Sequence, residues 1–235
     1  MRTPLLALAG RAGRAASRLL RDRDYRALAL LRAFRADQLH QTTAFTALDR
    51  YPEIFGQCRD LLQGREDLRI LSFGCSTGEE VATLRGYFPT AFIVGADLNP
   101  ESLRRARTHH ADAKIRYVRS DDRALAALGP FDIIFCMAVL QRTPHRIEAE
   151  GVEDISAIYP FGKFEKLVAQ LVANLKRGGL LVVEHAFYRV EDVRLAVPLR
   201  PVASPHLGPS TWLFDPSGRL MRGAARSCVI FEKPA

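Results

Sequence analysis

A glycine-bearing turn between an apolar run and a helical segment is the feature that most restricts how this chain can fold. Residues 68–73 read Leu-Arg-Ile-Leu-Ser-Phe, and Gly74-Cys75-Ser76-Thr77-Gly78 follows directly. A short apolar run that ends in glycine is typical of a parallel strand buried on both faces. Residues 79–87 then have helical character. A strand, a glycine turn and a helix in this order indicate the first unit of a doubly wound α/β sheet.

The same alternation continues along the chain. It predicts further strands at 92–96, 115–118, 131–136 and 180–183, and further helices at 100–110 and 163–175. We therefore predict an α/β fold with a doubly wound, mostly parallel sheet that has helices on both faces. The length of 235 residues suits one domain of this kind with a helical annex. The pattern changes near residue 66, which divides the chain into an N-terminal helical segment, 1–65, and an α/β domain, 66–235.

The N-terminal segment carries most of the net positive charge. The chain has 34 Lys and Arg against 26 Asp and Glu, a net charge of +8, and residues 1–40 contribute nine Arg against three Asp. Helical spacing of apolar residues, with Arg on a neighbouring face, predicts helix within 5–35, and Pro52 favours a further helix at 52–62. A basic amphipathic helix at 5–22 is consistent with peripheral contact to an anionic membrane surface or with contact to RNA.

The C-terminal region has weaker patterns. Residues 197–210 contain four prolines, which disfavour regular structure. Residues 212–214 and 228–231 have the character of two strands, and Asp215-Pro216-Ser217-Gly218 is a turn signal after the first of them. We predict that these two strands form an antiparallel pair that closes one edge of the sheet.

Several protein classes are disfavoured by what the sequence lacks. No apolar run approaches the roughly 20 residues of a membrane-spanning helix. The apolar stretch near the N-terminus has about six residues, fewer than the about seven that a signal peptide needs. The four cysteines are far apart and form no Cys-x-x-Cys pair, which disfavours a disulfide framework and a zinc site. We expect a cytoplasmic protein without a metal site.

The strand ends indicate what kind of ligand this sheet binds, because open α/β sheets bind ligands at the carboxyl ends of their strands. Asp97 ends the second strand 23 residues after Gly74, close to the roughly 20 expected for a carboxylate that binds ribose hydroxyls. The complete Gly-x-Gly-x-x-Gly pattern of dinucleotide sites is absent, and Glu79 and Glu80 in the first helical turn would repel a pyrophosphate. A ligand with adenine, ribose and a cationic group but no phosphate fits better, and S-adenosylmethionine has these properties.

Residues 70–185 resemble the class I S-adenosylmethionine-dependent methyltransferases. Ile70 to Glu80 is similar to the first motif of that family, and its Gly-Cys-Ser-Thr-Gly-Glu-Glu form is similar to the motif of chemotaxis receptor methyltransferases. Phe131 to Cys136 resembles the fourth-strand motif, and Leu175 to Leu180 resembles the turn before the fifth strand. The resemblance implies a Rossmann-like sheet of seven strands, methyltransferase activity and S-adenosyl-L-methionine as the cofactor. An N-terminal helical lid over the acceptor is common in this family, and residues 5–35 are interpreted in this way.

The resemblance also implies which residues bind the cofactor. Those expected at its methionine end and sulfonium are Gly74, Cys75, Gly78, Met137 and Ala138. Those expected at its ribose and adenine are Asp97, Leu98 and Asp121, with Asp122 as an alternative to Asp121. Ser72 departs from the family pattern, which often has an acidic residue there, so the partner of the cofactor's ammonium group is left open.

The acceptor is left open by the sequence. Direct methyl displacement needs a general base only when the acceptor must lose a proton, and the histidines placed to supply one are His145, after the fourth strand, and His185, after the fifth. A structural role for either histidine is the alternative. Tyr159, Phe161, Tyr188 and Arg189 are candidates for the acceptor pocket. We expect a small-molecule or peptide acceptor. The alternatives are an RNA methyltransferase and a non-catalytic cofactor-binding regulator. A nucleic-acid partner is possible but is not favoured.

Overall fold

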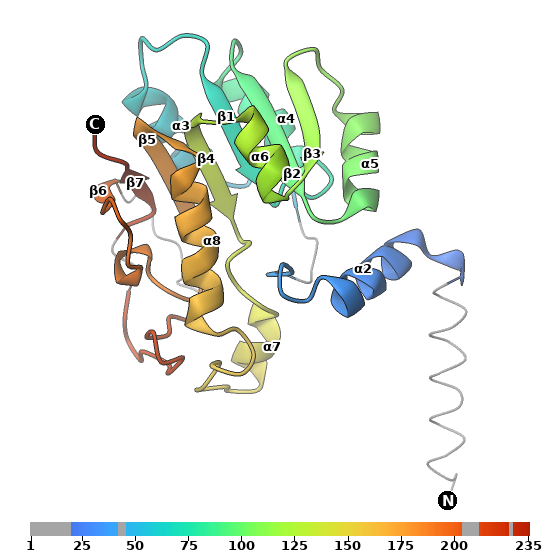
Figure 1. Cartoon of the computed structure of the whole chain (residues 1–235), viewed down its shortest axis with the longest axis vertical. Helices are drawn as coiled ribbons and strands as arrows, with labels where there is room; N and C mark the ends of the chain where they lie inside the picture. The colour runs from blue at the N-terminus through green and yellow to red at the C-terminus, as the bar shows by residue number, and fades with distance from the viewer. Residues whose placement is uncertain (1–19, 42–45, 204–211, 226–227) are drawn as a thin grey trace, which may run out of the picture.

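The sheet has seven strands in the spatial order β3-β2-β1-β4-β5-β7-β6 in the computed structural model of the chain (Figure 1). The structure describes residues 20–41, 46–203, 212–225 and 228–235. The strands are β1 (Arg69–Phe73), β2 (Phe92–Asp97), β3 (Ile115–Arg119), β4 (Phe131–Met137), β5 (Leu175–Glu184), β6 (Arg200–Ala203) and β7 (Ile230–Glu232). The helices are α2 (Arg23–Phe34), α3 (Pro52–Leu61), α4 (Glu79–Tyr87), α5 (Pro100–His109), α6 (Asp122–Leu128), α7 (Pro144–Ala149) and α8 (Phe161–Ala173), and η1 (Val190–Asp192) is a short 3₁₀ helix. The predicted α/β class and seven-stranded, doubly wound sheet are confirmed.

Strands β1 to β5 pair in parallel, and only the edge beyond β5 is antiparallel. Leu71 of β1 lies opposite Val94 of β2 on one side and Ile134 of β4 on the other. The carboxyl ends of these parallel strands therefore meet along one edge of the sheet. This edge faces α2 and α7 in Figure 1.

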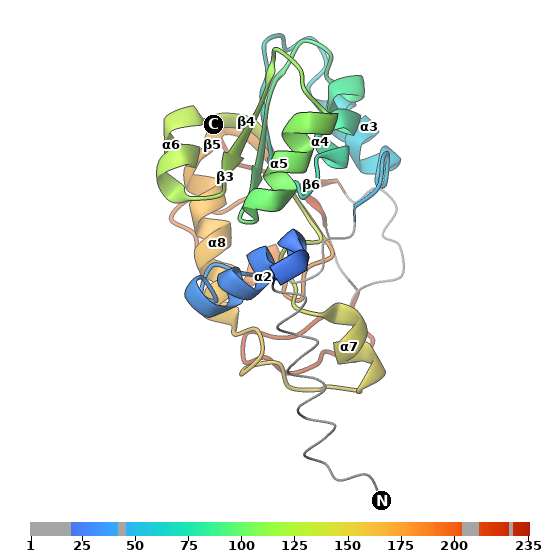
Figure 2. The same cartoon turned by 90° about the vertical axis from the view of Figure 1, so that its right-hand side faces the viewer.

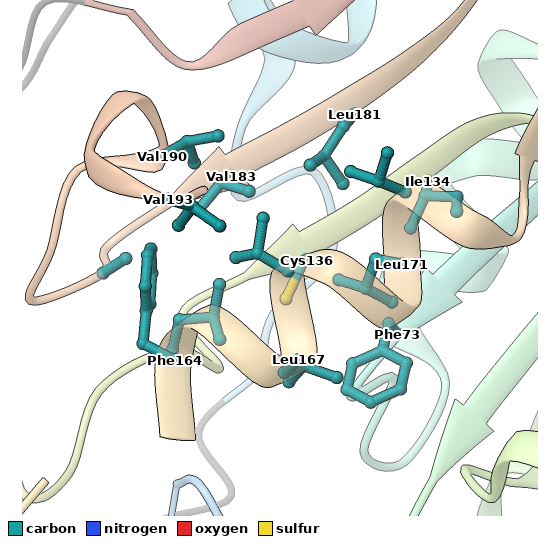
Figure 3. Close-up of a cluster of buried hydrophobic side chains, with 14 of the residues drawn as sticks. Phe73, Ile134, Cys136, Phe164, Leu167, Leu171, Leu181, Val183, Val190 and Val193 are labelled. Atoms are coloured by element: carbon teal, nitrogen blue, oxygen red, sulfur yellow. The ribbon is translucent and has the colours of Figure 1, made fainter. Parts of the chain in front are cut away.

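Two apolar clusters hold the helices on opposite faces of the sheet. On one face, Phe164, Leu167 and Leu171 of α8 pack against alternate residues of β4 and β5, among them Ile134 and Val183 (Figure 3). The other face is covered by α3, α4 and α5, whose buried residues pack against Ile70, Ile93, Ile133 and Phe135. Because neighbouring residues of a strand point to opposite faces, a continuous apolar run supplies both clusters. This is why the parallel strands could be recognised in the sequence.

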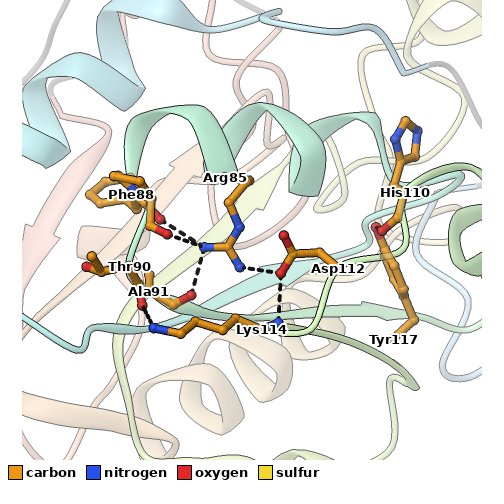
Figure 4. A network of polar contacts seen from close by, with 9 residues as sticks. Arg85, Phe88, Thr90, Ala91, His110, Asp112, Lys114 and Tyr117 are labelled. Atoms are coloured by element: carbon orange, nitrogen blue, oxygen red, sulfur yellow. Dashed lines mark hydrogen bonds and ion pairs between the residues drawn. The ribbon is translucent and has the colours of Figure 1, made fainter.

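Charged side chains fix the amino ends of the strands, away from the carboxyl edge. Arg85 at the end of α4 donates to the carbonyl oxygen of Ala91 (2.9 Å) and pairs with Asp112 (3.1 Å), and Lys114 donates to the carbonyl oxygen of Thr90 (3.0 Å) (Figure 4). These contacts bind the loops before β2 and β3 to each other. Lys114 therefore has a local structural role.

A second charged group joins three strands at the same edge. The buried carboxylate of Asp132, at the start of β4, accepts from the backbone N–H of Arg69 in β1 (2.9 Å) and pairs with Lys176 in β5 (2.8 Å) and with Arg65. Its oxygens are thus shared among β1, β5 and the loop before β1.

The C-terminal region differs from the prediction. The proline-bearing segment, expected to be irregular, contains β6, and β6 pairs with β7 with Pro201 opposite Phe231. Proline is tolerated there because β6 is an edge strand and needs no donor on its outer side. The predicted strand at 212–214 is wrong, since Phe214 makes only an isolated bridge with Leu220. The strand predicted at 228–231 is present as β7, and its partners are β5 and β6.

The helix predicted within 5–35 is interrupted at Asp22 in its described part. Asp22 has extended backbone angles, and its carboxylate caps α2 by accepting from the N–H of Tyr25 (3.0 Å). Figure 2 shows α2 below α5 and separate from the sheet, on the side of the carboxyl ends. Residues 1–19, which carry most of the predicted basic helix, lie outside the described residues. Within the described ranges, no helix combines the length and apolarity needed to cross a membrane.

Helix α3 belongs to the N-terminal segment by sequence but packs against the sheet. The ring of Phe55 contacts that of Phe135 in β4 edge to face, with centroids 5.3 Å apart. The division of the chain at residue 66 stays a prediction.

Candidate functional site

A cavity of about 990 Å³ lies at the carboxyl edge of the sheet. The ends of β1, β2 and β4 form one wall, and residues of α2 and α8 form others. The α2 wall presents Tyr25, Leu28 and Leu31, and the α8 wall presents Lys163 and Lys166 among others. The volume is at the upper end of the roughly 300–1,000 Å³ of small-molecule sites, so it has room for a cofactor and a small acceptor together.

The glycine turn after β1 forms part of this wall. Gly74 has a φ of +80°, and a Cβ atom at this position would lie 2.3 Å from Cγ2 of Val139. The N–H groups of Gly74 and Cys75 both donate to the carbonyl oxygen of Ala96 in β2 (2.7 and 3.1 Å). The turn is therefore fixed on the neighbouring strand and passes too close to Val139 for any side chain at position 74.

Asp97 connects the end of β2 to the glycine turn. One of its carboxylate oxygens accepts from the N–H of Ser76 (2.9 Å) and the other from the N–H of Asn99 (2.7 Å). Burial raises the pKa of this carboxyl, and backbone N–H donors at Asn99, Ser76 and Leu98 oppose the rise. Two backbone donors thus orient a carboxylate that lines the cavity.

Glu80 is a second carboxylate in the cavity wall. It lies in the first turn of α4, and its Oε1 accepts from the hydroxyl of Ser72 in β1 (2.7 Å). Burial raises the pKa of Glu80 to about 7, while the Ser72 hydroxyl and the Arg50 guanidinium act to lower it. Ser72 is the position where the family pattern has an acid. The carboxylate is therefore present at this place in the fold, but it is supplied from the helix.

Most of the residues predicted to bind the cofactor lie around this cavity. The predicted residues that line it are Gly74, Cys75, Asp97, Leu98, Asp121, Met137 and Ala138. Asp121 caps α6, accepting from the N–H of Ala124 (2.9 Å). Burial raises the pKa of the Cys75 thiol well above its usual value, which disfavours a nucleophilic role.

Two of the predicted cofactor residues are placed differently. Gly78 caps α4 with a φ of +99°, and a Cβ atom there would meet Tyr117 and Ala106 on the side of α5, so its position favours helix packing. Asp122 begins α6, and its side chain is not among the described ones.

The histidines predicted as bases do not line the cavity. His145 is exposed on α7, and His185 follows β5 with a φ of +51° and its ring against that of Tyr51, with centroids 5.8 Å apart. Tyr159, Phe161, Tyr188 and Arg189 also lie outside the cavity lining. The catalytic role of His145 and His185 stays a prediction that the geometry does not favour.

The polar residues of the cavity wall that the sequence did not predict include Glu80, His40 and Lys163. The sequence indicates only that Glu80 would repel a phosphate. Its position in the first helical turn, six residues after Gly74, is the signal that could have placed it over the glycine turn. His40 had no signal, because its partner is Tyr159, 119 residues away in the sequence.

The donor set of the cavity fits S-adenosylmethionine in charge and shape. Asp97 supplies a carboxylate suited to hydroxyl groups, and Glu80 supplies one suited to an ammonium. Leu98 and Leu125 add apolar surface. The hydroxyl oxygen of Ser76 is buried and has no partner among the described residues, so it is free to bind a ligand that enters the cavity. The part of the chain that the structure describes has no cluster of potential metal ligands.

Comparison with known proteins identifies the domain. Residues 70–159 match a methyltransferase domain family. The chain is 30% identical over 115 residues to a trans-aconitate 2-methyltransferase of Azoarcus sp. (strain BH72), covering 49% of this chain and 38% of that protein. It is 34% identical over 95 residues to a ubiquinone biosynthesis O-methyltransferase of Neisseria meningitidis serogroup C, covering 36% of this chain and 39% of that protein. The chain therefore spans less than half the length of these relatives.

Solved structures of similar proteins include an amino pentose methyltransferase of Micromonospora echinaspora with bound S-adenosylmethionine. It has a TM-score of 0.46 and 20% sequence identity, and the match covers 69% of this chain and 58% of that one.

Proposed function

We propose that the protein transfers a methyl group from S-adenosylmethionine to an oxygen atom of a small organic acceptor. The match of residues 70–159 to a methyltransferase domain family and the order of the sheet strands support this proposal. The observation that carries the proposal is the position of the glycine turn and Asp97 in the wall of one large cavity. The N–H of Ser76 in that turn donates to Asp97 (2.9 Å), so the two features form one preorganised unit.

We propose that each end of the cofactor has its own residues. Asp97 accepts hydrogen bonds from the ribose hydroxyls, Leu98 packs on the adenine, and Asp121 binds the adenine edge. Glu80, held by Ser72, pairs with the ammonium group of the methionine part. These roles use the side chains that line the cavity and match each charge of the cofactor with an opposite or hydrogen-bonding partner.

Bound S-adenosylmethionine supplies an electrophilic methyl group on a sulfonium. A lone pair of an ionised acceptor oxygen would form the new O–CH₃ bond while the S–CH₃ bond breaks with its electron pair left on sulfur, so that no proton has to be removed. Met137 and Ala138, which line the cavity after β4, are proposed to flank the reacting atoms. The protein contributes alignment and exclusion of water. Leu28 and Leu31 of α2 form an apolar part of the cavity wall. We propose that this part limits the access of water to the reacting atoms.

The acceptor class follows from the cavity and from the relatives. One of the relatives named above is, by its name, a trans-aconitate 2-methyltransferase. The other is, by its name, an O-methyltransferase of ubiquinone biosynthesis. About 990 Å³ is enough space for a small acceptor beside the cofactor. A small molecule with a reactive oxygen is therefore the acceptor that we propose.

Isothermal titration calorimetry with S-adenosylmethionine tests the cofactor site. We expect binding by the wild-type protein and a loss of at least about tenfold in affinity for Asp97→Ala, since a hydrogen bond to a charged group contributes roughly 1.5–3 kcal/mol. Absence of binding by the folded wild-type protein would contradict the proposal. Incubation with a labelled methyl donor and fractionated cell extract then tests the acceptor, and label in RNA or protein in place of small molecules would refute the acceptor class.

A further inference from the structure

A buried imidazole enters the cavity from the N-terminal side. His40 follows α2 in the chain, is 8% exposed and lines the cavity. Its Nδ1 lies 2.5 Å from the hydroxyl oxygen of Tyr159, which is fully buried in the loop before α8. Within the described ranges, Tyr159 is the hydrogen-bonding partner of His40.

This pairing determines which nitrogen of His40 carries the proton. The Tyr159 hydroxyl has one proton to donate, and among the described residues its partner is Nδ1 of His40. A buried hydroxyl proton needs an acceptor, so Nδ1 accepts and Nε2 carries the N–H. The ring is then a fixed donor through Nε2. Burial, together with the charges of Lys163 and Arg142, lowers the pKa of His40 to about 3, so the imidazole stays neutral at physiological pH.

Lys163 adds a cation to the same part of the cavity wall. Its Nζ donates to the carbonyl oxygens of Ala36 and Leu39, both at 2.8 Å. An ammonium has three N–H donors, so one remains after these two bonds. Burial and Arg142 lower the pKa of Lys163 to about 8, while Asp37 opposes the shift. The ammonium is therefore mostly charged at pH 7.

The acidic residues proposed to bind the cofactor and the lysines of α8 come from different elements, although Arg50 also acts on Glu80 and Asp37 on Lys163. Glu80, Asp97 and Asp121 come from the carboxyl ends of the sheet and the first turns after them, where the cofactor is proposed to bind. Lys163 and Lys166 come from α8, one helical turn apart. No cofactor role is proposed for Lys163 or His40, so this part of the lining is left for the second ligand.

We propose that His40 and Lys163 form an anion-binding subsite that holds an ionised carboxylate of the acceptor. The inference rests on the proposed function, since it assigns the part of the cavity that the cofactor does not use. An N–H donor and an ammonium side by side are complementary to the two oxygens of a carboxylate. Lys163 is partly buried. With a neutral acceptor, its third N–H would have no charged partner there, which is unfavourable.

The alternative is that these residues only fasten the segment after α2. Arg142 provides a matched control, because it donates to the same carbonyl oxygen of Leu39 (2.7 Å) but does not line the cavity. A purely structural role predicts similar losses for Arg142→Met and Lys163→Met. A ligand-binding role predicts a loss for Lys163→Met alone.

Calorimetry on protein saturated with S-adenosylhomocysteine tests the subsite. The probes are trans-aconitate and benzoate, and their uncharged counterparts are the trimethyl ester of trans-aconitate and benzamide. We expect at least one carboxylate to bind at least about tenfold more tightly than its neutral counterpart. His40→Phe and Lys163→Met should each lose about tenfold or more of this affinity, as for loss of a hydrogen bond to a charged group. Arg142→Met should lose less than about threefold.

Two further results separate this proposal from the proposed function. If S-adenosylhomocysteine binds but neither carboxylate is preferred over its neutral counterpart, or if Arg142→Met loses as much as Lys163→Met, the anion subsite is refuted and the cofactor site stands. If S-adenosylhomocysteine does not bind, the proposed function itself fails. Unchanged S-adenosylhomocysteine affinity in each variant shows that the variant is folded. ¹⁵N chemical shifts of His40 in the wild-type protein provide an independent check, since protonation at Nδ1 would contradict the assigned tautomer.

Discussion

The hydroxyl of Ser72 in β1 donates a hydrogen bond of 2.7 Å to the carboxylate of Glu80 in α4. This contact joins the strand before the glycine turn to the helix after it. It also places a carboxylate where Ser72 itself supplies no charge. Burial raises the pKa of Glu80 to about 7, so the charge of this group changes within the physiological range.

The affinity for S-adenosylhomocysteine is expected to increase with pH through about 7. Below that pH the Glu80 carboxyl is protonated and offers no charge to the ammonium of the ligand. Above it the carboxylate is ionised, so a cation binds more tightly and binding releases a proton. Calorimetry between pH 5.5 and pH 8 in buffers of different ionisation enthalpy measures both the affinity and the proton release.

Glu80→Gln should remove this pH dependence and weaken binding at pH 8 by about tenfold or more. Glu79→Gln is the matched control, because it removes the same charge from the same helical turn. Glu79 accepts from the hydroxyl of Thr77 (2.7 Å). Equal losses in the two variants would show that the general negative charge of the turn, and not Glu80, determines the affinity.

Gly74→Ala is expected to abolish cofactor binding, while Gly64→Ala leaves it intact. Both glycines have left-handed backbone angles, with φ of +80° and +82°, so alanine at either position costs roughly 1–2 kcal/mol of folding stability. A Cβ atom at Gly74 also lies 2.3 Å from Cγ2 of Val139, whereas nothing lies within 4 Å at Gly64. Thermal unfolding and titration with S-adenosylhomocysteine compare the two variants.

A second substitution tests the reason for this effect. Val139→Ala removes the clashing methyl groups, so the double variant Gly74→Ala, Val139→Ala should recover part of the lost affinity. Failure to recover any affinity would mean that backbone strain at position 74 is sufficient to distort the turn.

The parts of the fold that the sequence predicted are those with a strong local signal. Ile133 and Ile134 lie in one apolar run because β4 is buried on both faces, and such runs are recognised without knowledge of their partners. The first-turn position of Glu79 is likewise local. Strand β6 was missed because Pro201 indicates irregular structure unless the strand is known to lie at an edge.

The candidate site was only partly predictable for a similar reason. Asp97 and the turn at Gly74 are recognised by spacing along the chain, since both belong to one strand–helix–strand unit. His40 is recognised only when Tyr159 is brought against it, and Lys163 only when its helix faces the segment after α2. Contacts of this kind depend on the packing of distant segments, which no local pattern records.

Replacing either predicted base is expected to have little effect on turnover. His145 is exposed on α7, and His185 packs against Tyr51 outside the cavity lining. With an acceptor found by methyl labelling, His145→Ala and His185→Ala should keep kcat within about threefold of the wild-type value, since general-base catalysis contributes roughly 10²–10⁴-fold. A loss of about a hundredfold or more in either variant, with S-adenosylhomocysteine affinity unchanged, would identify that histidine as the base.

Asp132→Ala is expected to lower the free energy of unfolding by about 3–5 kcal/mol, the range for breaking a buried ion pair. Asp132 is 2% exposed. Its carboxylate accepts from the backbone N–H of Arg69 and pairs with the side chains of Lys176 and Arg65. Its removal leaves these donors of β1 and β5 unpaired at the amino end of the sheet. Asp60→Ala is the control, because Asp60 pairs with Arg59 on the surface and should change stability by less than about 1 kcal/mol. Urea unfolding measures both values, and a loss below about 1 kcal/mol for Asp132→Ala would show that these side-chain contacts contribute little to the stability of the sheet. Asp132 and Met137 lie at opposite ends of β4. The folded fraction of Asp132→Ala should therefore bind S-adenosylhomocysteine with the affinity of the wild-type protein. This result would separate the stability of the sheet from ligand binding at its carboxyl edge.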